Sequence, residues 1–397
     1  MPDDLYDVIV VGAGPAGSYT AYELAKAGRR VAVFEEKSAP GLDICCTGII
    51  STECFESVGV SRDVILACSN SARFFSPSGR CLRLQTEETL AYVVDRSRFD
   101  RAIAEKAQAE GVQYFFSSPV TSITPREDRM EVEVRCPGAT DRFDARAVML
   151  ANGCRPRLSR MLGLGRITRF FVGAQAEVET NDVAEVEVHF GREIAPGSFA
   201  WIVPVSENRA YAGLLTTSYA RQRLGRFIEN LVRENRAVRQ DDEIRQKAIP
   251  LGTPARTYGD RLLAVGDSAG QVKPTTGGGI YFGHLGAKIA AEVLDEALRD
   301  DDLSARRLAR YEKRWKAMMG RELARGYLAR WAYARMSDRQ VERIFTVMDS
   351  TGAAEALLRS REFSFDWHSG LALAGLRRSA AYPWLRLRQF LLKEAGT

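Results

Sequence analysis

The hydrophobic pattern of the first 36 residues predicts a strand, a helix and a second strand. Positions 8–11 are four consecutive apolar residues, as in a buried strand, and positions 31–34 repeat the pattern. Between these runs, apolar residues recur at helical spacing; they are Tyr19, Ala21, Leu24 and Ala25. The chain therefore opens with a parallel strand–helix–strand unit.

The turn at residues 12–17 of this unit, which reads GAGPAG, predicts a dinucleotide site. Gly12 permits a tight turn, Gly14 lets backbone N–H groups approach a pyrophosphate, and Gly17 allows close packing of helix on strand. The helix N-terminus adds partial positive charge for phosphates. Glu35, 18 residues after Gly17, is placed to accept hydrogen bonds from a ribose. The alternative is a glycine-rich turn that binds nothing.

The rest of the N-terminal half alternates between helical and extended patterns. We predict helices at 52–59 and 95–111, extended pieces over 72–94, and strands at 112–116, 119–124, 130–136 and 147–150. The last of these strands ends in a turn at Asn152 and Gly153.

The second half changes character. Short alternating runs between about 170 and 215 predict an antiparallel sheet inserted as a separate layer. Residues 217–247 are densely charged, and we predict a helical segment there. A strand at 262–265 runs into GDSAG, and a triple glycine at 277–279 precedes an apolar helix over 280–298. The pattern over 303–348 predicts a long helical region.

These elements predict an α/β fold with an α+β insert: a Rossmann-like binding domain, an inserted antiparallel substrate sheet and a helical C-terminal region. We assign the binding domain to 1–70, 95–165 and 251–300. The substrate domain takes 71–94 and 166–250, and the helical region takes 301–397.

Charge and composition narrow the function classes. Apolar residues make up 45% of the 397 residues, enough for a sizeable core. The net charge of +5 is uneven, because residues 303–397 hold 19 Lys and Arg against 9 Asp and Glu. A basic tail can serve an anionic membrane surface, nucleic acid or only solvation. Because no nucleic-acid motif accompanies it, we expect no nucleic-acid partner.

Cysteine and histidine usage argues against a metal site. The seven cysteines have irregular spacing, which fits neither a zinc site nor a disulfide framework, and the three histidines lie far apart. We therefore expect no metal. The first strand starts too early for a signal peptide, and no apolar run reaches the length of a membrane span. We expect a cytoplasmic protein.

Three stretches together resemble the flavoprotein hydroxylase-like superfamily of FAD-binding proteins. They are the GAGPAG turn, the RSRFD sequence at 96–100 that opens a helix, and GDSAG followed by PTTGGG at 266–279. A fourth stretch, from Asn152 to Arg160, resembles the second motif of that superfamily, with Asn152 in place of its usual Asp. The resemblance covers roughly residues 5–300 and implies FAD as cofactor.

The resemblance also implies which residues bind FAD. Asp267 follows a strand, where the superfamily places a carboxylate on the ribityl chain, and the triple glycine lets backbone amides approach the flavin ring. The expected FAD-binding residues are Gly12, Gly14, Ala16, Gly17, Glu35, Glu36, Cys46, Thr47, Arg96, Asp267, Gly277, Gly278, Gly279 and Ile280.

Within that superfamily, two signals resemble the geranylgeranyl reductase family. Residues 46–51, CTGIIS, are similar to its C-G-x-x-x-S loop over the flavin, with Thr47 in place of Gly. Residues 199–204, FAWIVP, with Gly213 downstream, are similar to its Y-x-W-x-F-P…G substrate motif. We expect Phe199, Trp201, Pro204 and Gly213 to bind substrate. The alternative is a strand that packs on its own core.

The family resemblance implies reduction of C=C bonds in a polyprenyl chain by hydride transfer from reduced flavin. The substrate is an isoprenoid lipid, a prenyl alcohol or a quinone tail. An isolated alkene also needs a proton on its second carbon, and Cys46 is the candidate catalytic residue that holds it. The alternative is that Cys46 only fills a tight loop. NAD(P)H, a ferredoxin or another electron-donor protein would reduce the flavin.

Flavin-dependent halogenases and monooxygenases of the same fold are the alternative function. Halogenases carry a W-x-W-x-I-P motif that overlaps residues 199–204, but they need a lysine in the loop that corresponds to 41–51, and this loop has none. A third alternative is a flavin-binding protein without enzymatic activity.

A prenyl lipid must be collected from a bilayer or a carrier, so we expect peripheral contact with an anionic membrane, on its inner face. Residues 380–393, AAYPWLRLRQFLLK, place aromatic and aliphatic side chains opposite a basic face, as an in-plane interfacial helix requires. The alternative is a short helix that packs on the protein itself.

Overall fold

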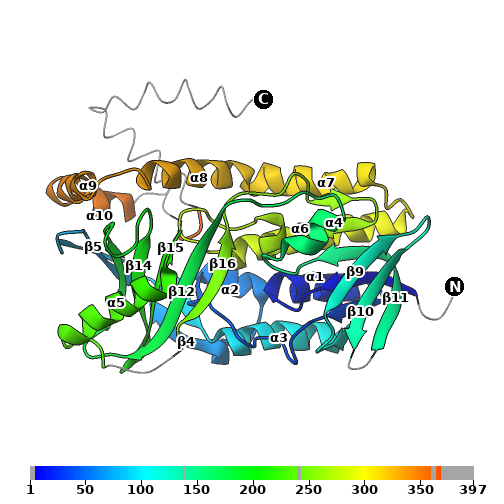
Figure 1. Cartoon of the computed structure of the whole chain (residues 1–397), viewed down its shortest axis with the longest axis horizontal. Helices are drawn as coiled ribbons and strands as arrows, with labels where there is room; N and C mark the ends of the chain where they lie inside the picture. The colour runs from blue at the N-terminus through cyan, green and yellow to red at the C-terminus, as the bar shows by residue number, and fades with distance from the viewer. Residues whose placement is uncertain (1–4, 137–138, 239–242, 359–363, 368–397) are drawn as a thin grey trace, which may run out of the picture.

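The computed structural model describes residues 5–136, 139–238, 243–358 and 364–367. Two sheets lie toward opposite ends of an elongated molecule, and long helices run along one edge past both of them (Figure 1). The expected α/β fold with an inserted sheet is confirmed.

The first sheet has eight strands and forms the binding domain. Five strands make its centre in the order β18-β11-β1-β2-β8, and all four neighbouring pairs are parallel. The antiparallel strands β9, β10 and β17 extend it. The strands are β1 (Leu5–Val11), β2 (Val31–Phe34), β8 (Gln113–Phe115), β9 (Val120–Pro125), β10 (Met130–Cys136), β11 (Ala139–Leu150), β17 (Tyr258–Gly259) and β18 (Leu262–Ala264).

Three helices cover one face of this sheet and bury the main core. Helix α1 (Pro15–Lys26) packs against both α3 (Arg96–Ala109) and α6 (Ile280–Arg299). The apolar residues of β1, such as Val8 and Val10, are fully buried beneath them. The predicted strand–helix–strand unit is therefore confirmed, with β1 and β2 parallel.

The second sheet has seven strands in the order β16-β12-β15-β14-β13-β5-β6. We expected an antiparallel sheet, and one pair departs from this, because β13 and β5 run parallel. Helix α5 (Ala220–Arg233) covers one face. The strands are β5 (Ser71–Phe75), β6 (Cys81–Gln85), β12 (Phe170–Glu179), β13 (Val186–Phe190), β14 (Phe199–Ser206), β15 (Arg209–Thr216) and β16 (Arg245–Pro250).

Residues 71–94 divide between two sheets. β5 and β6 join the second sheet, whereas β7 (Ala91–Val94) pairs with β3 (Ile49–Ser51) and β4 (Ile65–Ser69) in a small third sheet. Helix α2 (Thr52–Val58) follows β3 directly, and the Ser51 hydroxyl accepts a hydrogen bond from the Cys54 N–H as its N-cap. The single group expected at 71–94 is thus two structural units.

The helical segment predicted over 217–247 is wrong beyond Arg233. Helix α5 ends at Arg233, and residues from Arg245 onward form β16. β16 lies at the edge of its sheet, where exposed charged side chains are tolerated and even favoured. The pattern of charge that suggested a solvated helix therefore marks a solvated edge strand.

The C-terminal helical region runs as predicted from α7 (Ala305–Trp315) through one π turn (Lys316–Gly320) into α8 (Arg321–Tyr333). A break at residues 334–337 separates it from α9 (Asp338–Ser350), which begins with a capping box of Ser337 and Gln340. The short helices α4 (Pro156–Met161) and α10 (Ala353–Leu358) complete the described fold. Among the helices of these residues, none is both long and apolar enough to cross a bilayer.

Candidate active site

The glycine turn after β1 has the geometry of a phosphate cradle. A Cβ on Gly12, whose φ is +106°, would lie 2.5 Å from the Ala151 carbonyl oxygen, and one on Gly17 would overlap the Gly12 carbonyl. Gly14 differs, because a Cβ there would meet no atom within 4 Å. Gly14 is also the N-cap of α1, without a capping side chain or an acid in the first turn. The turn thus leaves open space at an uncapped helix N-terminus, as a pyrophosphate requires.

Glu35 stands at the end of β2 beside this turn. Its carboxylate accepts hydrogen bonds from the Ala13 N–H at 2.7 Å and from the Lys37 N–H at 3.0 Å. Glu36 instead forms an ion pair with Arg155. The structure therefore places Glu35 against the glycine turn and Glu36 against the loop after β11, and their contact with a ribose stays a prediction.

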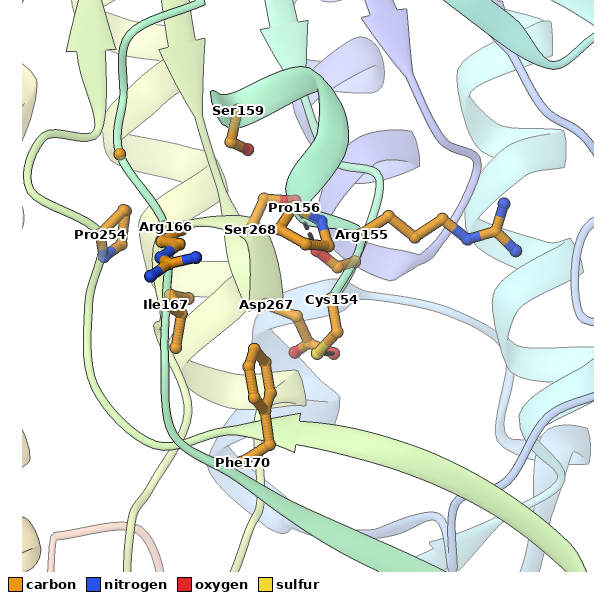
Figure 2. A pocket seen from close by; sticks show the side chains of 12 residues that line it. Cys154, Arg155, Pro156, Ser159, Arg166, Ile167, Phe170, Pro254, Asp267 and Ser268 are labelled. Atoms are coloured by element: carbon orange, nitrogen blue, oxygen red, sulfur yellow. Dashed lines mark hydrogen bonds between the residues drawn. The ribbon is translucent and has the colours of Figure 1, made fainter. Parts of the chain in front are cut away.

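A second loop meets the glycine turn from β18. Ala16 lies against Gly266, where an added Cβ would be 3.1 Å from the Ala16 Cβ. Asp267 follows, and its Oδ2 lies 3.0 Å from the Lys247 Nζ and 3.8 Å from the Cys154 Sγ. Figure 2 shows Cys154 and Asp267 pointing toward each other while Arg155 points away. The Asp267 charge raises the pKa of Lys247 above its ordinary value.

Asn152 has a structural role in this arrangement. The Ser268 hydroxyl lies 3.0 Å from the Asn152 Oδ1, and the Asn152 amide donates to the Arg155 carbonyl at 3.1 Å. The side chain that replaces the superfamily's Asp therefore ties the loop after β11 to the loop after β18.

The triple glycine forms the third wall and ends at a helix N-terminus. Gly279 is the N-cap of α6 and carries no capping side chain, and the first turn beginning with Ile280 holds no acid. Gly277 has a φ of +73° and lies against Leu215 and Ile249 of the second sheet. A Cβ on Gly278 would lie 2.9 Å from the Lys273 Cε. The uncapped N-terminus of α6 thus carries a partial positive charge suited to a reduced flavin, and the Asp267 Oδ1 lies beside it, 3.1 Å from where a Cβ on Gly279 would be.

The loop before β3, which contains Cys46 and Thr47, closes the site on the side opposite the triple glycine. The Thr47 hydroxyl lies 2.8 Å from the Gln175 Oε1, and the Gln175 amide donates to the Cys46 carbonyl at 3.4 Å. Both contacts tie the loop to β12 of the second sheet. The Cys46 thiol faces Arg96, which forms a two-pronged ion pair with Asp100 at 3.0 Å.

Burial controls the charge of the groups around this loop. Burial disfavours the Arg96 charge, but Asp100 and then Cys46 outweigh it, so the pKa of Arg96 is raised. Burial raises the pKa of Cys45 to about 11 and that of Cys154 to about 12. Both of these thiols are therefore neutral near pH 7, and both lie near the cationic Lys247.

The predicted substrate strand, β14, directs its aromatic residues Phe199 and Trp201 toward the candidate active site. The Trp201 indole lies flat on Gly213, where a Cβ would be 2.5 Å from its Cε2 atom. The Phe199 ring lies 5.9 Å from that of Trp201. Both belong to an apolar cluster with Phe171, Leu215, Ile249, Leu251 and Tyr327. Pro204 lies further along β14, at the bulge before Ser206.

Strand register joins this wall to the Cys46 loop. Gln175 pairs with Gly213 across β12 and β15, and Gly213 pairs with Trp201 across β15 and β14. Directly opposed residues point to the same face of a sheet. The residue that holds Cys46 and Thr47 and the residue that forms the wall are therefore neighbours on one face.

A polar cavity of about 300 Å³ opens beside Cys46. Its lining includes acids, bases and polar side chains from the second sheet, the Cys46 loop and the start of α3; the residues are Ile44, Cys46, Asp95, Arg96, Ser97, Gln175, Ala176, Glu177, Arg209, Tyr211, Glu243 and Arg245.

Sequence reasoning missed three residues of the site. Lys247 was assigned to a helix, Gln175 is one polar residue within an apolar strand, and Lys273 carries no motif signal of its own. Gln175 offered the one usable clue, because a buried amide in a strand must find hydrogen-bond partners. No cluster of metal-ligating side chains occurs in the described part of the chain.

Comparison with known proteins agrees with this geometry. The lycopene cyclase protein family matches residues 7–349. The chain is 32% identical to digeranylgeranylglycerophospholipid reductase 2 of Methanopyrus kandleri, over 87% of this chain and 90% of that protein. It is 31% identical to digeranylgeranylglycerophospholipid reductase of Methanocaldococcus jannaschii, over 86% and 90%.

Solved structures share the fold. A geranylgeranyl bacteriochlorophyll reductase-like protein from Thermoplasma acidophilum superposes with a TM-score of 0.86 at 23% identity, over 97% of this chain and 99% of that protein. A flavin-dependent brominase has a TM-score of 0.70 at 18% identity, over 95% and 99%. The halogenase fold is thus related, as the alternative interpretation assumed.

The fold and the relatives define an FAD-dependent oxidoreductase whose first sheet is accompanied by an inserted second sheet. The similarity to curated relatives extends over nearly the whole chain. The chain belongs to the geranylgeranyl reductase family of FAD-dependent enzymes, which confirms the resemblance inferred from its motifs.

Proposed function

We propose that this protein saturates C=C bonds of a polyprenyl chain in a lipid, a prenyl alcohol or a quinone. The observation that carries this proposal is the position of Trp201. Its indole forms an apolar wall on Gly213, one residue pair away from the glutamine that holds the Cys46 loop. An aromatic wall beside a proton-bearing group suits an apolar alkene that must gain two hydrogens.

FAD, when bound, supplies the hydride for this reduction. The open space at Gly14, the acid at Glu35 and the N-terminus of α6 after Gly279 fit its pyrophosphate, its ribose and its ring. Asp267 lies between these regions and fits the ribityl hydroxyls. These side chains bind and orient the cofactor, and none of them needs to move a proton.

The protein's own chemical task is to deliver a proton to the second alkene carbon. We assign that proton to the Cys46 Sγ. When the S–H bond breaks and the C–H bond forms, the sulfur is left with a negative charge. Arg96 and Lys247 both face Cys46 and compensate that charge. The polar cavity beside Cys46 gives a path by which solvent restores the proton.

Each saturated double bond consumes two electrons, so a reductant must restore the flavin after every turnover. NAD(P)H and a ferredoxin are the two candidates, and the second implies an electron-donor protein as partner. Anaerobic titration of the oxidised enzyme with each donor, followed by flavin absorbance, distinguishes them.

The test of the proposed function is anaerobic incubation of dithionite-reduced protein with several prenyl lipids. We expect mass increments of two hydrogens per saturated bond. A product that forms only with oxygen, or with oxygen and halide, would instead support the monooxygenase or halogenase alternative. The Cys46 loop lacks the lysine that a halogenase needs, and Lys247 is ion-paired with Asp267.

A prenyl lipid is scarcely soluble in water, so the proposed function also implies peripheral contact with an anionic membrane on its cytoplasmic side. The helix predicted over 380–393 as the contact lies outside the described residues. Flotation of the full chain with anionic vesicles, compared with a chain that ends at Ala380, tests that prediction.

A further inference from the structure

Exposed apolar side chains gather along one edge of the molecule. Helix α8, the π turn before it and α9 form this edge (Figure 1). Four large apolar residues on them are strongly exposed, with 51% for Met318, 40% for Leu328, 42% for Ile344 and 55% for Val347. We call the outward side of residues 318–347 the edge face.

Exposed basic residues lie on the same sides of α8 and α9 as exposed apolar residues. Arg339, Arg343 and Val347 follow at four-residue intervals on α9, so they share one side of the helix. Arg321 and Leu328, seven residues apart, share one side of α8 in the same way. All five side chains are exposed.

The acids of these helices are engaged on the protein itself. Asp338 accepts a hydrogen bond from the Arg192 N–H, and Glu342 accepts one from the Ser78 N–H. Asp349 forms an ion pair with Arg80, and Glu322 is buried. Each of these acids is therefore paired with the protein or buried, whereas the cationic and apolar groups named above are exposed.

Aromatic rings in contact with one another connect the buried side of α8 and α9 to Phe199 and Trp201 of β14. Phe190 contacts Tyr333 of α8 at 5.9 Å and Phe345 of α9 at 5.8 Å between ring centroids. Phe190 also contacts Phe199 at 6.2 Å, which in turn contacts Trp201. An unbroken row of rings thus runs from beneath the edge face to the candidate active site.

We propose that the edge face docks on an anionic phospholipid bilayer. Apolar side chains enter the acyl boundary while arginines meet the phosphates, as interfacial helices do. The aromatic row offers a prenyl chain an apolar path from that surface to Trp201. This proposal rests on the proposed function for its purpose, but its contact surface is independent of residues 380–393.

The test compares two triple variants of the full chain by flotation. The first replaces Leu328, Ile344 and Val347 by Glu. The matched control replaces Leu66, Met161 and Val238 by Glu, which are exposed apolar residues elsewhere, at 38%, 52% and 42%. Vesicles contain phosphatidylcholine with phosphatidylglycerol, or phosphatidylcholine alone. Both variants change the net charge equally, so a difference between them reports position.

We expect the parent and the control to float with the anionic vesicles and the edge variant to lose at least about tenfold in partitioning. A second pair removes charge only: Arg339→Gln with Arg343→Gln should weaken partitioning to the vesicles about 30-fold, whereas Arg101→Gln with Arg160→Gln should weaken it much less. Edge variants that float like the parent overturn the proposal, as does a parent that floats equally with neutral vesicles.

Two further measurements distinguish membrane docking from self-association and from a catalytic defect. Sedimentation of the parent and the edge variant reveals whether the face joins two copies of the chain; a dimer that the variant disrupts overturns membrane docking. Reduction of a detergent-solubilised prenyl lipid by the edge variant at the parental rate, with loss of reduction on vesicles, supports it. Failure of both parent and variant in detergent would contradict the proposed function but leave the flotation result intact.

Discussion

At the scale of single residues, Cys46 is the decisive side chain for the proposed chemistry. Cys46→Ser keeps the contacts of the loop with Gln175, because these use the Cys46 carbonyl and Thr47. We expect FAD binding to stay intact and alkene reduction to slow by about 10²–10⁴-fold, the usual effect of a positioned acid. Anaerobic single-turnover reoxidation of the reduced flavin measures this.

The neighbouring thiol supplies the control. Cys45 contacts the Gly173 and Arg245 carbonyls instead of Arg96, and its raised pKa keeps it neutral. Cys45→Ser should therefore reduce alkenes at close to the parental rate. If Cys46→Ser also stays within about twofold of the parent, well short of the usual effect of a positioned acid, Cys46 fills space and the proton comes from another group.

Gly213 tests the wall on which the substrate is proposed to lie. Gly213→Ala places a Cβ 2.5 Å from the indole Cε2, so Trp201 must leave its position. We expect a raised KM for the prenyl substrate, with FAD still bound, as for Trp201→Ala. Gly225→Ala on α5 is the control, since nothing lies within 4 Å of its Cβ, and a helical alanine should stabilise the fold by about 1 kcal/mol. An unchanged KM in Gly213→Ala would remove Trp201 from the substrate site.

At the scale of elements, substitutions of two glycines in the same turn should have different effects, one on FAD binding and the other on folding stability. A Cβ on Gly14 would meet no protein atom within 4 Å, so Gly14→Val should leave the fold intact but lose FAD affinity, because the new side chain takes the place of the pyrophosphate. Gly17→Val overlaps the Gly12 carbonyl and crowds the Ala151 Cβ at 2.9 Å, so it should cost about 3 kcal/mol of folding stability or more.

Flavin absorbance and thermal unfolding measured on the same samples separate the two outcomes. A yellow Gly14→Val protein with parental FAD affinity would show that the phosphates lie elsewhere. A Gly17→Val protein with parental stability would mean that α1 can move away from β1.

The contrast between the unit from β1 to β2 and the strand β16 explains which parts of the fold could be predicted from the sequence. The unit from β1 to β2 is contiguous, so its period, its glycines and Glu35 can all be recognised within 36 residues. β16 could not be recognised, because an edge strand shows its polar face to solvent and Arg245, Gln246 and Lys247 have no alternation. The consequence was that Lys247, a neighbour of both Asp267 and Cys46, was absent from the predicted site.

Gln175 and Gly213 show a second limit. Their importance comes from a register that pairs strands 38 residues apart and then adds Trp201 from a third strand. A motif can indicate that Trp201 and Gly213 belong to one site. Gln175, which connects them to the Cys46 loop, can be identified only from the pairing of the strands in the sheet.

At the scale of the whole molecule, the described C-terminal residues 364–367 return to the FAD domain. Asp366 is 2% exposed, and its carboxylate lies 2.7 Å from the Lys273 Nζ. The Trp367 ring packs 5.2 Å from Phe282 of α6. Lys273 also borders Gly278 of the triple glycine and donates its backbone N–H to the Gly278 carbonyl at 2.9 Å. Residues 364–367 thus support the wall predicted to hold the flavin.

Asp366→Asn should therefore destabilise the protein and weaken FAD binding together. Loss of one partner leaves the Lys273 charge buried, which typically costs about 3–5 kcal/mol, and it releases the lysine side chain that lies against Gly278. Asp349→Asn is the control, because its pair with Arg80 is exposed on both sides and should contribute less than about 1 kcal/mol. Chemical denaturation gives the stability and fluorescence titration gives the FAD affinity. If Asp366→Asn unfolds at a lower denaturant concentration but binds FAD as the parent does, the C-terminal segment stabilises the fold without shaping the flavin wall.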